Sequence, residues 1–120
     1  MKDQHTKTIR DHNDLFRAAH MAGQHTDIPG RIVITRGIAY LEEAQQQAIF
    51  AKVRDFDSFT EDNDPYGEHD FGSITHAGNK VFWKIDYYAA GFPHIEEGSE
   101  DPANPQKTCR VLTIMLAEEY

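Results

Sequence analysis

The sequence predicts an α+β fold of two layers, in which an antiparallel sheet of about four strands carries two helices on one face. Two segments in the first half have apolar residues at helical spacing, and the second half has short runs typical of β-strands. A hairpin signal and a long loop connect the last three strands, which favours antiparallel pairing. With 120 residues, no internal repeat and no linker, we expect a single domain over residues 1–120.

The first helix is expected over residues 7–22, ending at Gly23, with Arg17 outside its apolar face. That face consists of Ile9, Leu15, Phe16, Ala19 and Ala22. A second helix is expected from Glu42 to about Asp55. Its apolar positions are Ala44, Ala48, Phe50 or Ala51, and Val53.

Four strands are expected, over residues 31–35, 71–76, 80–88 and 108–117. The third alternates apolar and polar residues around Trp83, and the fourth is almost entirely apolar, which favours a central position. We therefore expect Trp83 to pack against Leu112, Ile114 and Leu116 on the neighbouring strand. Residues 77–79 form a hairpin connection, whereas residues 38–41 either prolong the first strand past a bulge or form a tight connection.

The net charge of −8 is concentrated in residues 42–70, where two basic and nine acidic residues give −7. Such a balance argues against direct binding to a nucleic-acid backbone and instead suits a basic partner. No apolar run approaches the roughly 20 residues of a membrane helix, and the polar first residues lack the apolar core of a signal peptide. We therefore expect a cytoplasmic protein without membrane contact. The single cysteine, Cys109, excludes an internal disulfide.

Residues 55–70, here called the acidic loop, contain no Lys or Arg and many carboxylates. Leaving these carboxylates unpaired inside a small domain would cost more free energy than folding supplies, so we expect most of them to face water or a partner. Phe56 and Phe59 are expected to fold back onto the core and pin the loop. Asn63 to Gly67 form a turn cluster with Tyr66 near its tip.

Four strings of the sequence resemble a small bacterial family of unknown function, number thirty-seven sixty-eight, which is common on plasmids and other mobile elements. These strings are RIVITRGIA (31–39), VRDFDSFTEDNDPYGEHDFGS (53–73), VFWKIDYY (81–88) and SEDPANPQKTCRVLTIMLAEEY (99–120). The resemblance brings no activity, cofactor or catalytic residue. It implies an association with mobile DNA, where small acidic proteins often counteract host defences.

Charge, loop and resemblance together lead to one functional hypothesis. The chain would be a non-enzymatic acidic binding protein without a cofactor, an inhibitor of the anti-CRISPR or anti-restriction type that imitates nucleic acid. Its partner would be a basic nucleic-acid-binding protein or ribonucleoprotein of a host defence system. The predicted contact residues are Asp57, Glu61, Asp62, Asp64, Tyr66, Glu68, Asp70, Glu96, Glu97, Glu100 and Asp101.

The alternative is a small metal-dependent or acid/base enzyme centred on Glu68, His69 and Asp70, with Asp86 nearby. Against it, consecutive residues of an extended chain point in opposite directions, and no zinc-binding or nucleophile motif is present. We expect Asp64 and Asp70 to accept bonds from loop N–H groups instead. Lys84 and Asp86 would form a solvated pair. A third possibility is that the chain is a regulatory partner of a plasmid protein.

Overall fold

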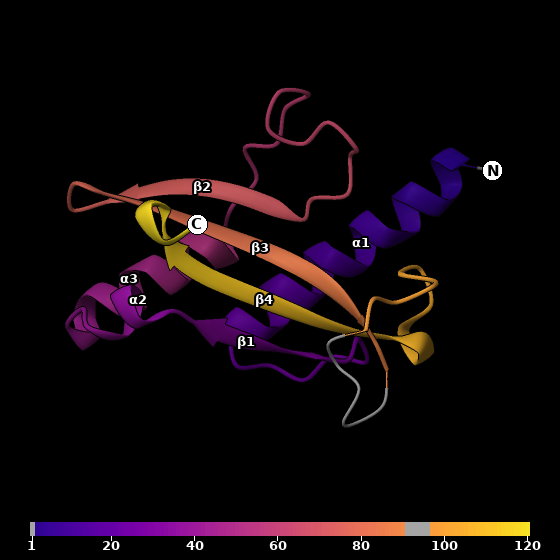
Figure 1. The fold of residues 1–120 in the computed structure, drawn as a ribbon, viewed down its shortest axis with the longest axis horizontal. Coiled ribbons are helices and arrows are strands. Elements are labelled where there is room, and N and C mark those ends of the chain that lie inside the picture. The colour runs from indigo at the N-terminus through magenta and orange to yellow at the C-terminus, as the bar shows by residue number, and fades with distance from the viewer. Residues whose placement is uncertain (1, 91–96) are drawn as a thin grey trace.

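A computed structural model describes residues 2–90 and 97–120, with side chains from Gln4 onward, and shows a four-stranded sheet with helices on one side (Figure 1). The strands are β1 (Gly30–Ile34), β2 (Phe71–His76), β3 (Asn79–Ala89) and β4 (Thr108–Leu116). The helices are α1 (Lys2–Met21), α2 (Arg36–Ala39) and α3 (Glu43–Arg54), with 3₁₀ turns at Pro105–Lys107 (η1) and Ala117–Glu119 (η2). The predicted α+β class is confirmed.

The strand order is β1-β4-β3-β2, so β4 lies inside the sheet as its apolar sequence predicted. The pairs β2–β3 and β3–β4 are antiparallel, whereas β1 pairs with β4 in parallel, with Ile32 opposite Leu112. The sheet is therefore mixed rather than wholly antiparallel. A parallel pair needs a long crossover connection, and here the chain between β1 and β4 includes α2, α3 and the hairpin.

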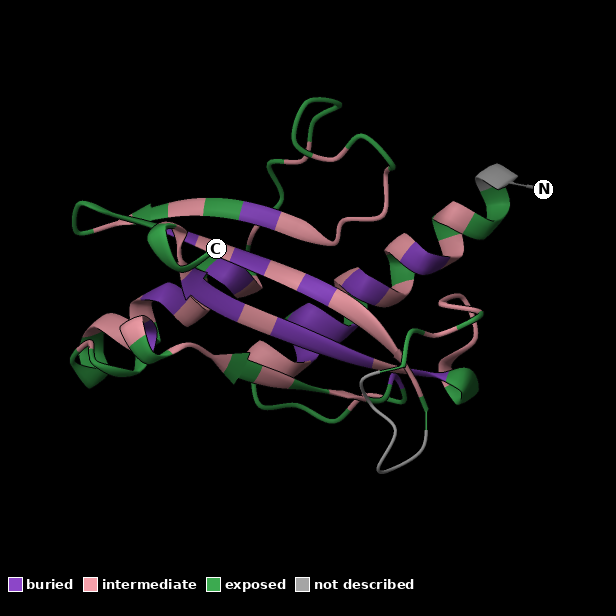
Figure 2. Ribbon diagram, viewed as in Figure 1, coloured by how far each residue is buried: buried purple, intermediate pink, exposed green. Residues whose placement is uncertain are grey.

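The core lies between the sheet and the helices, and its centre is Trp83, which is fully buried. Trp83 is opposite Ile114, and the flanking pairs join Val81 to Leu116 and Ile85 to Leu112, which confirms the predicted packing across strands. Phe56 and Phe59 pack against the same cluster, also as predicted. Figure 2 shows α1 and α3 on one face of the sheet. On the opposite face of the described strands, Tyr120 after η2 packs against Phe71 and Phe82, and parts of β4 are buried there too.

Helix α1 begins earlier than predicted, at Lys2, and its buried face is rotated from the expected one. Leu15 is 52% exposed, whereas Arg17 is only 4% exposed. Arg17 is buried because its guanidinium donates to the carbonyls of Val53 (3.0 Å) and Phe56 (2.9 Å) at the end of α3. Those carbonyls have no partner inside the helix, so a buried arginine satisfies them better than a leucine would.

Residues 38–41 form the tight connection rather than a longer strand, because α2 is a single helical turn with Ile38 fully buried. The second predicted helix is confirmed as α3, although its buried residues are Ile49 and Val53. Within the described part of the chain, no helix has the length and apolar character needed to cross a membrane.

Candidate functional site

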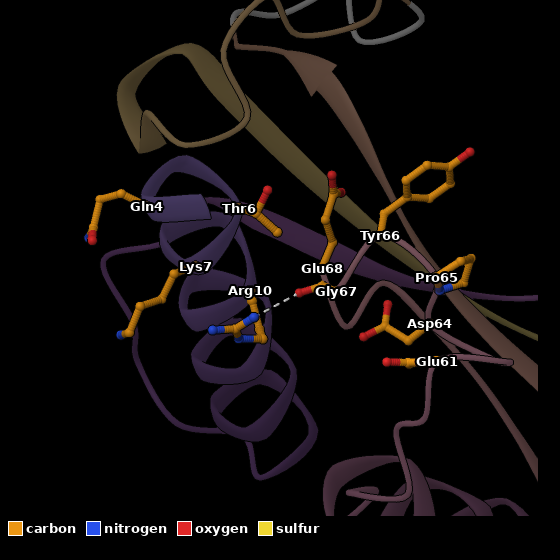
Figure 3. Close-up of a pocket in the computed structure, with 10 residues that line it drawn as sticks. All are labelled: Gln4, Thr6, Lys7, Arg10, Glu61, Asp64, Pro65, Tyr66, Gly67 and Glu68. Atoms are coloured by element: carbon orange, nitrogen blue, oxygen red, sulfur yellow. Dashed lines mark hydrogen bonds between the residues drawn. The ribbon is translucent and has the colours of Figure 1, made fainter. Parts of the chain in front are cut away.

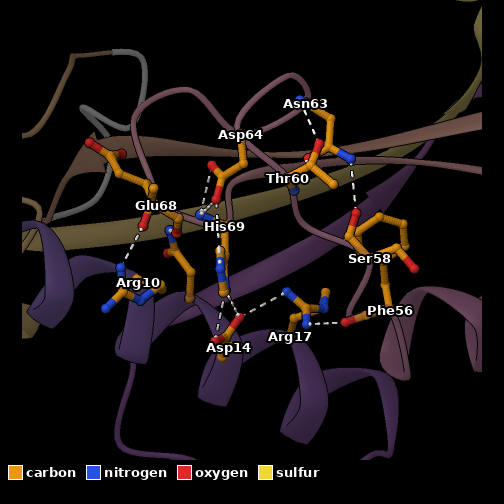
Figure 4. Close-up of polar contacts among 12 residues, drawn as sticks. Arg10, Asp14, Arg17, Phe56, Ser58, Thr60, Asn63, Asp64, Glu68 and His69 are labelled. Carbon is orange, nitrogen blue, oxygen red and sulfur yellow. Dashed lines mark hydrogen bonds and ion pairs between the residues drawn. The ribbon is translucent and has the colours of Figure 1, made fainter.

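The acidic loop is tied to one side of α1 by three polar residues of that helix, Arg10, Asn13 and Asp14, of which Figure 4 labels Arg10 and Asp14. Arg10 Nη1 donates to the Gly67 carbonyl at 3.2 Å, and Asn13 Nδ2 donates to the Glu68 carbonyl at 2.9 Å. One turn further along, the two Asp14 carboxylate oxygens lie 2.9 and 3.0 Å from His69 Nδ1. The loop is thus a fixed part of the structure over residues 67–69.

His69 is the most constrained residue of the loop. It adopts a left-handed backbone conformation with φ of 56°, and its ring stacks on Phe59 with centroids 3.7 Å apart. The ring nitrogen that does not face Asp14 lies 3.6 Å from the Asp64 carboxylate, which also accepts the His69 backbone N–H at 3.2 Å. His69 is therefore held between two carboxylates and does not contribute to an open site.

Asp64 and Glu68 are structural groups of the loop rather than free surface charges. The Asp64 side chain is only 6% exposed, so the expectation that it is wet is wrong. Burial is tolerated because both carboxylate oxygens accept the backbone N–H of His69, at 3.2 and 3.3 Å. Glu68 is half-buried and accepts the Tyr87 hydroxyl at 2.7 Å.

A buried polar chain continues from Glu68 into the core. The Tyr87 hydroxyl accepts from Asn13 Nδ2 at 2.8 Å, and Asn13 Oδ1 accepts from Arg110 Nε at 2.6 Å. Both Asn13 and Arg110 are fully buried. Burial strongly raises the pKa of Tyr87 and lowers that of Arg110. The phenol therefore stays protonated and remains the donor that orients the Glu68 carboxylate.

A cleft of about 790 Å³ separates α1 from the acidic loop (Figure 3). Its walls are formed by Gln4, Thr6, Lys7 and Arg10 of α1 and by Glu61, Asp64, Pro65, Tyr66, Gly67 and Glu68 of the loop. The charge of Lys7 is matched by Asp11, whose carboxylate is 2.7 Å away. The cleft is polar and open rather than an enclosed small-molecule pocket.

A smaller hollow of about 400 Å³ lies on the other side of the loop tip, next to the face of the sheet that carries Phe71 and Lys84. It is lined by Asn63, Pro65, Tyr66, Asp70, Phe71, Lys84, Ile85, Asp86 and Tyr120. Lys84 and Asp86 form the ion pair expected for this face, with their charged atoms 3.0 Å apart. Tyr66 lines both depressions and is 81% exposed.

Asp70 has the most unusual carboxyl group of the loop. Burial, followed by the nearby charges of Glu68, Asp64 and Asp86, raises its pKa to about 6. No positively charged group is among the causes of the shift in the pKa of Asp70. The carboxyl group is therefore surrounded by negative charge and is partly protonated near neutral pH.

The predicted contact residues fall into two groups. Asp57, Glu61, Asp62, Tyr66, Glu97 and Glu100 are exposed, whereas Asp64, Glu68, Asp70 and Asp101 are partly buried. Glu96 lies outside the described residues. Asp101 is 4.0 Å from His5 of α1, so the segment near β4 and the acidic loop both reach this helix. In the described parts of the chain, no hydrogen bond or ion pair joins the two acidic segments directly.

Of the four residues of the enzyme alternative, Asp70 and Asp86 line one hollow with Glu68 close to Asp70, whereas His69 does not join them. His69 is turned towards α1, while Asp86 lies on the sheet face opposite to the helices. Across residues 2–90 and 97–120, no three His, Cys, Asp or Glu side chains form a group that could hold a metal ion.

Sequence patterns did not reveal the buried polar residues Asn13, Arg17 and Arg110, or the half-buried Asp14. One signal was present: Arg110 is in phase with Leu112 and Ile114 along an apolar strand, and so faces the core.

Comparison with known proteins supplies a family but no activity. Neither the curated proteins nor the solved structures gave a match. The family model described as a protein of unknown function (DUF3768) matches residues 34–119, from the end of β1 through η2, and leaves α1 outside the match. Because the match covers most of the chain, this protein belongs to that family.

Proposed function

We propose that the chain is a non-enzymatic acidic binding protein that uses the ridge of the acidic loop to occupy a basic surface of its partner. The partner is a nucleic-acid-binding protein or ribonucleoprotein of a host defence system, as in anti-CRISPR or anti-restriction inhibition. The association with mobile elements that accompanies the family resemblance supports this context. The chemistry requires only that the partner present Arg and Lys side chains that normally contact phosphates.

The observation that carries the proposal is that some polar residues of the acidic loop hold its backbone while others remain exposed. Asp64, Glu68 and His69 are bonded inwards and hold the backbone, while Asp57, Glu61 and Asp62 remain exposed in the same loop as the exposed Tyr66. A loop that is already ordered loses little conformational entropy on binding, so its exposed charges and aromatic ring contribute more of their interaction energy to affinity. Exposed carboxylates next to an exposed tyrosine suit an arginine-rich surface.

The test is a charge-neutralised variant that carries Asp57→Asn, Glu61→Gln and Asp62→Asn. These three side chains are exposed, so the fold is expected to survive the changes. Proteins captured from host lysate are identified, and the captured nucleic-acid-binding protein is purified for kinetics at two salt concentrations. The wild-type association rate should fall steeply with salt and double-stranded DNA should compete, while the variant should associate at least tenfold more slowly.

A matched control carries Glu42→Gln, Glu43→Gln and Glu118→Gln, three exposed carboxylates outside the acidic loop. Both variants change the net charge from −8 to −5, so overall charge is equal and only its location differs. The control should associate at nearly the wild-type rate. Equal rates for the two variants, or affinity that is indifferent to salt and to DNA, would rule out recognition through the loop.

A second function, acid/base catalysis, is favoured by one observation: the carboxyl group of Asp70 has a pKa of about 6 and lines a hollow. A general acid or base works best when its pKa is close to the working pH. A screen with chromogenic esters, phosphate esters and glycosides would test it. Turnover that is lost in Asp70→Asn and follows a pKa near 6 would support catalysis, and no turnover would exclude it for these substrate classes.

A further inference from the structure

We propose that the hollow between Tyr66 and Tyr120 is a binding site for a guanidinium group, and that an arginine side chain of the partner enters it. The inference rests on the proposed function for the identity of the partner, but not for the chemistry of the site. It assigns one particular partner side chain to one particular hollow.

The first argument is the exposure of the two tyrosines. Tyr66 is 81% exposed on the loop tip and Tyr120 is 75% exposed after η2, and the two line the same hollow. Tyr120 also packs edge-on against Phe71 and Phe82, with ring centroids 6.1 and 5.6 Å away. Two exposed rings backed by further aromatic residues are the geometry in which proteins bind organic cations.

The second argument is the charge of the hollow. Asp86 and Lys84 share the sheet face of Phe71 and form an ion pair, with Lys84 Nζ 3.0 Å from Asp86 Oδ2. Asp70 lines the same hollow and has no ion-pair partner among the described residues. Burial, and after it the charges of Glu68, Asp64 and Asp86, disfavours the charged form of Asp70 and raises its pKa. An incoming cation would relieve that repulsion.

A guanidinium group fits these features better than an ammonium ion or a nucleobase does. It is flat and can lie along a tyrosine ring, and it donates to a carboxylate through two parallel N–H groups. An ammonium ion would compete directly with Lys84 for the same Asp86 oxygen. A nucleotide would bring its phosphate towards Asp70 and Asp86, where like charges repel.

The test uses a small probe, so that it does not depend on finding the partner. Acetyl-Gly-Arg-Gly-amide is titrated into protein with labelled tyrosine rings, and the ring resonances are followed by NMR. The rings of Tyr66 and Tyr120 should shift in a saturable way, with a dissociation constant on the order of millimolar. The citrulline analogue of the peptide, which has the shape of arginine without its charge, should bind at least tenfold more weakly, and the lysine peptide should also bind more weakly.

The chain offers a matched control in Tyr40, which is 80% exposed at the end of α2 and lines neither depression. Tyr66→Ala should lose at least tenfold in affinity for the arginine peptide, while Tyr40→Ala should bind as the wild type does. Asp86→Asn should weaken binding as well. The backbone spectrum of each variant shows whether its fold is intact, and Tyr66→Phe retains the ring if the alanine variant is unstable.

Several results would overturn the inference. Equal shifts at Tyr40 and Tyr66 would show unspecific attraction to an acidic protein, and stronger shifts with adenosine or uridine would assign the hollow to a base. Failure of the peptide to bind, combined with salt-dependent binding of a basic protein to the loop, would refute this site and leave the proposed function standing. Peptide binding at the hollow without any basic protein partner would support this site and refute the proposed function.

Discussion

Trp83 is a residue of the sheet that contacts both α1 and the acidic loop. Arg17 lies over its ring at 4.8 Å, and the rings of Phe56 and Phe59 approach it edge-on at 5.5 and 6.1 Å. Gly72 lies against the other side, where a Cβ atom would be 2.3 Å from the indole nitrogen. The indole therefore fills its space completely and tolerates neither a larger neighbour nor its own removal.

Replacement of Trp83 by alanine should destabilise the domain by roughly 3–5 kcal/mol, because a large cavity opens where three segments meet. Urea unfolding measures the change. Leu15→Ala is the control, because this leucine is 52% exposed and its loss should cost less than about 1 kcal/mol. A Trp83→Ala variant that unfolds at nearly the wild-type urea concentration would contradict the central position of the indole.

Asp70→Asn should make the protein more stable above pH 6 and leave its stability near pH 4 almost unchanged. Burial and neighbouring carboxylates raise the pKa of Asp70 to about 6. Between pH 4 and 6 the unfolded chain has already released this proton while the folded chain still binds it, so wild-type stability falls as the pH rises. In Asp70→Asn the uncharged amide removes this loss of stability. We expect a gain of about 1–2 kcal/mol in the free energy of unfolding, because Asp70 retains some contact with water.

Thermal unfolding of wild type and Asp70→Asn at pH 4, 5, 6 and 7.5 would measure the difference between the two curves. Asp57→Asn serves as the control, since it removes an exposed carboxylate of the same loop and should give no such pH-dependent gain. A constant difference between the Asp70→Asn and wild-type curves at all four pH values would show that the change acts through packing and not through the proton.

At the scale of elements, the sequence predicted most of the fold and little of the site. Apolar periodicity located α3, β2, β3 and β4, because burial imposes a spacing that can be counted. On α1 the buried positions of Ile9, Phe16 and Ala19 were predicted correctly, whereas Leu15 and Ala22 are exposed. Arg17 is buried because it donates to carbonyls near the end of α3, and hydrophobicity does not reveal such a role. The contacts from α1 to the loop join residues about 55 positions apart, so no local pattern could indicate them.

The attachment of the acidic loop to α1 should depend on His69. In His69→Ala, Asp14 and Asp64 lose their shared partner, and the loop loses its stacking on Phe59. Amide hydrogen exchange over residues 60–69 should become at least tenfold faster, while exchange in β3 and β4 changes far less. Association with a partner should then slow as well, because an ordered loop is what the proposed function requires.

His69→Gly separates the two roles of this residue, since glycine accepts the left-handed φ of 56° without strain but lacks the imidazole. Fast exchange in both variants would assign the effect to the lost side chain. Normal protection in both would refute the role of His69 as the attachment. His25→Ala, at an exposed histidine outside the loop, should behave as the wild type does.

At the scale of the whole molecule, the net charge of −8 is held by a small domain in which nine of the 20 acidic residues lie within residues 42–70. Self-repulsion among like charges opposes the compact state and is weakened by salt over distances of about 10 Å. Buried groups such as Arg17 and Arg110 are shielded from salt, so their contacts change little. We therefore expect salt to stabilise the folded protein.

The melting temperature should rise by a few degrees when sodium chloride increases from 10 to 150 mM. The variant with neutralised Asp57, Glu61 and Asp62 should show a smaller rise, because less repulsion remains to be screened. Scanning calorimetry at both salt concentrations measures the effect. A melting temperature that falls with salt would mean that surface ion pairs such as Lys7–Asp11 outweigh the repulsion.

The parallel pairing of β1 with β4 also bears on how the chain acquires its shape during translation. Gly30 is opposite Arg110, so β1 has no strand partner until the ribosome has synthesised the chain as far as β4. The hairpin of β2 and β3 can form earlier, because its strands are adjacent. Arg110 is also the residue that supports Asn13, and through it Tyr87 and Glu68. A nascent chain therefore carries its acidic loop before the support for that loop exists, and the last strand to be made is the one that completes it.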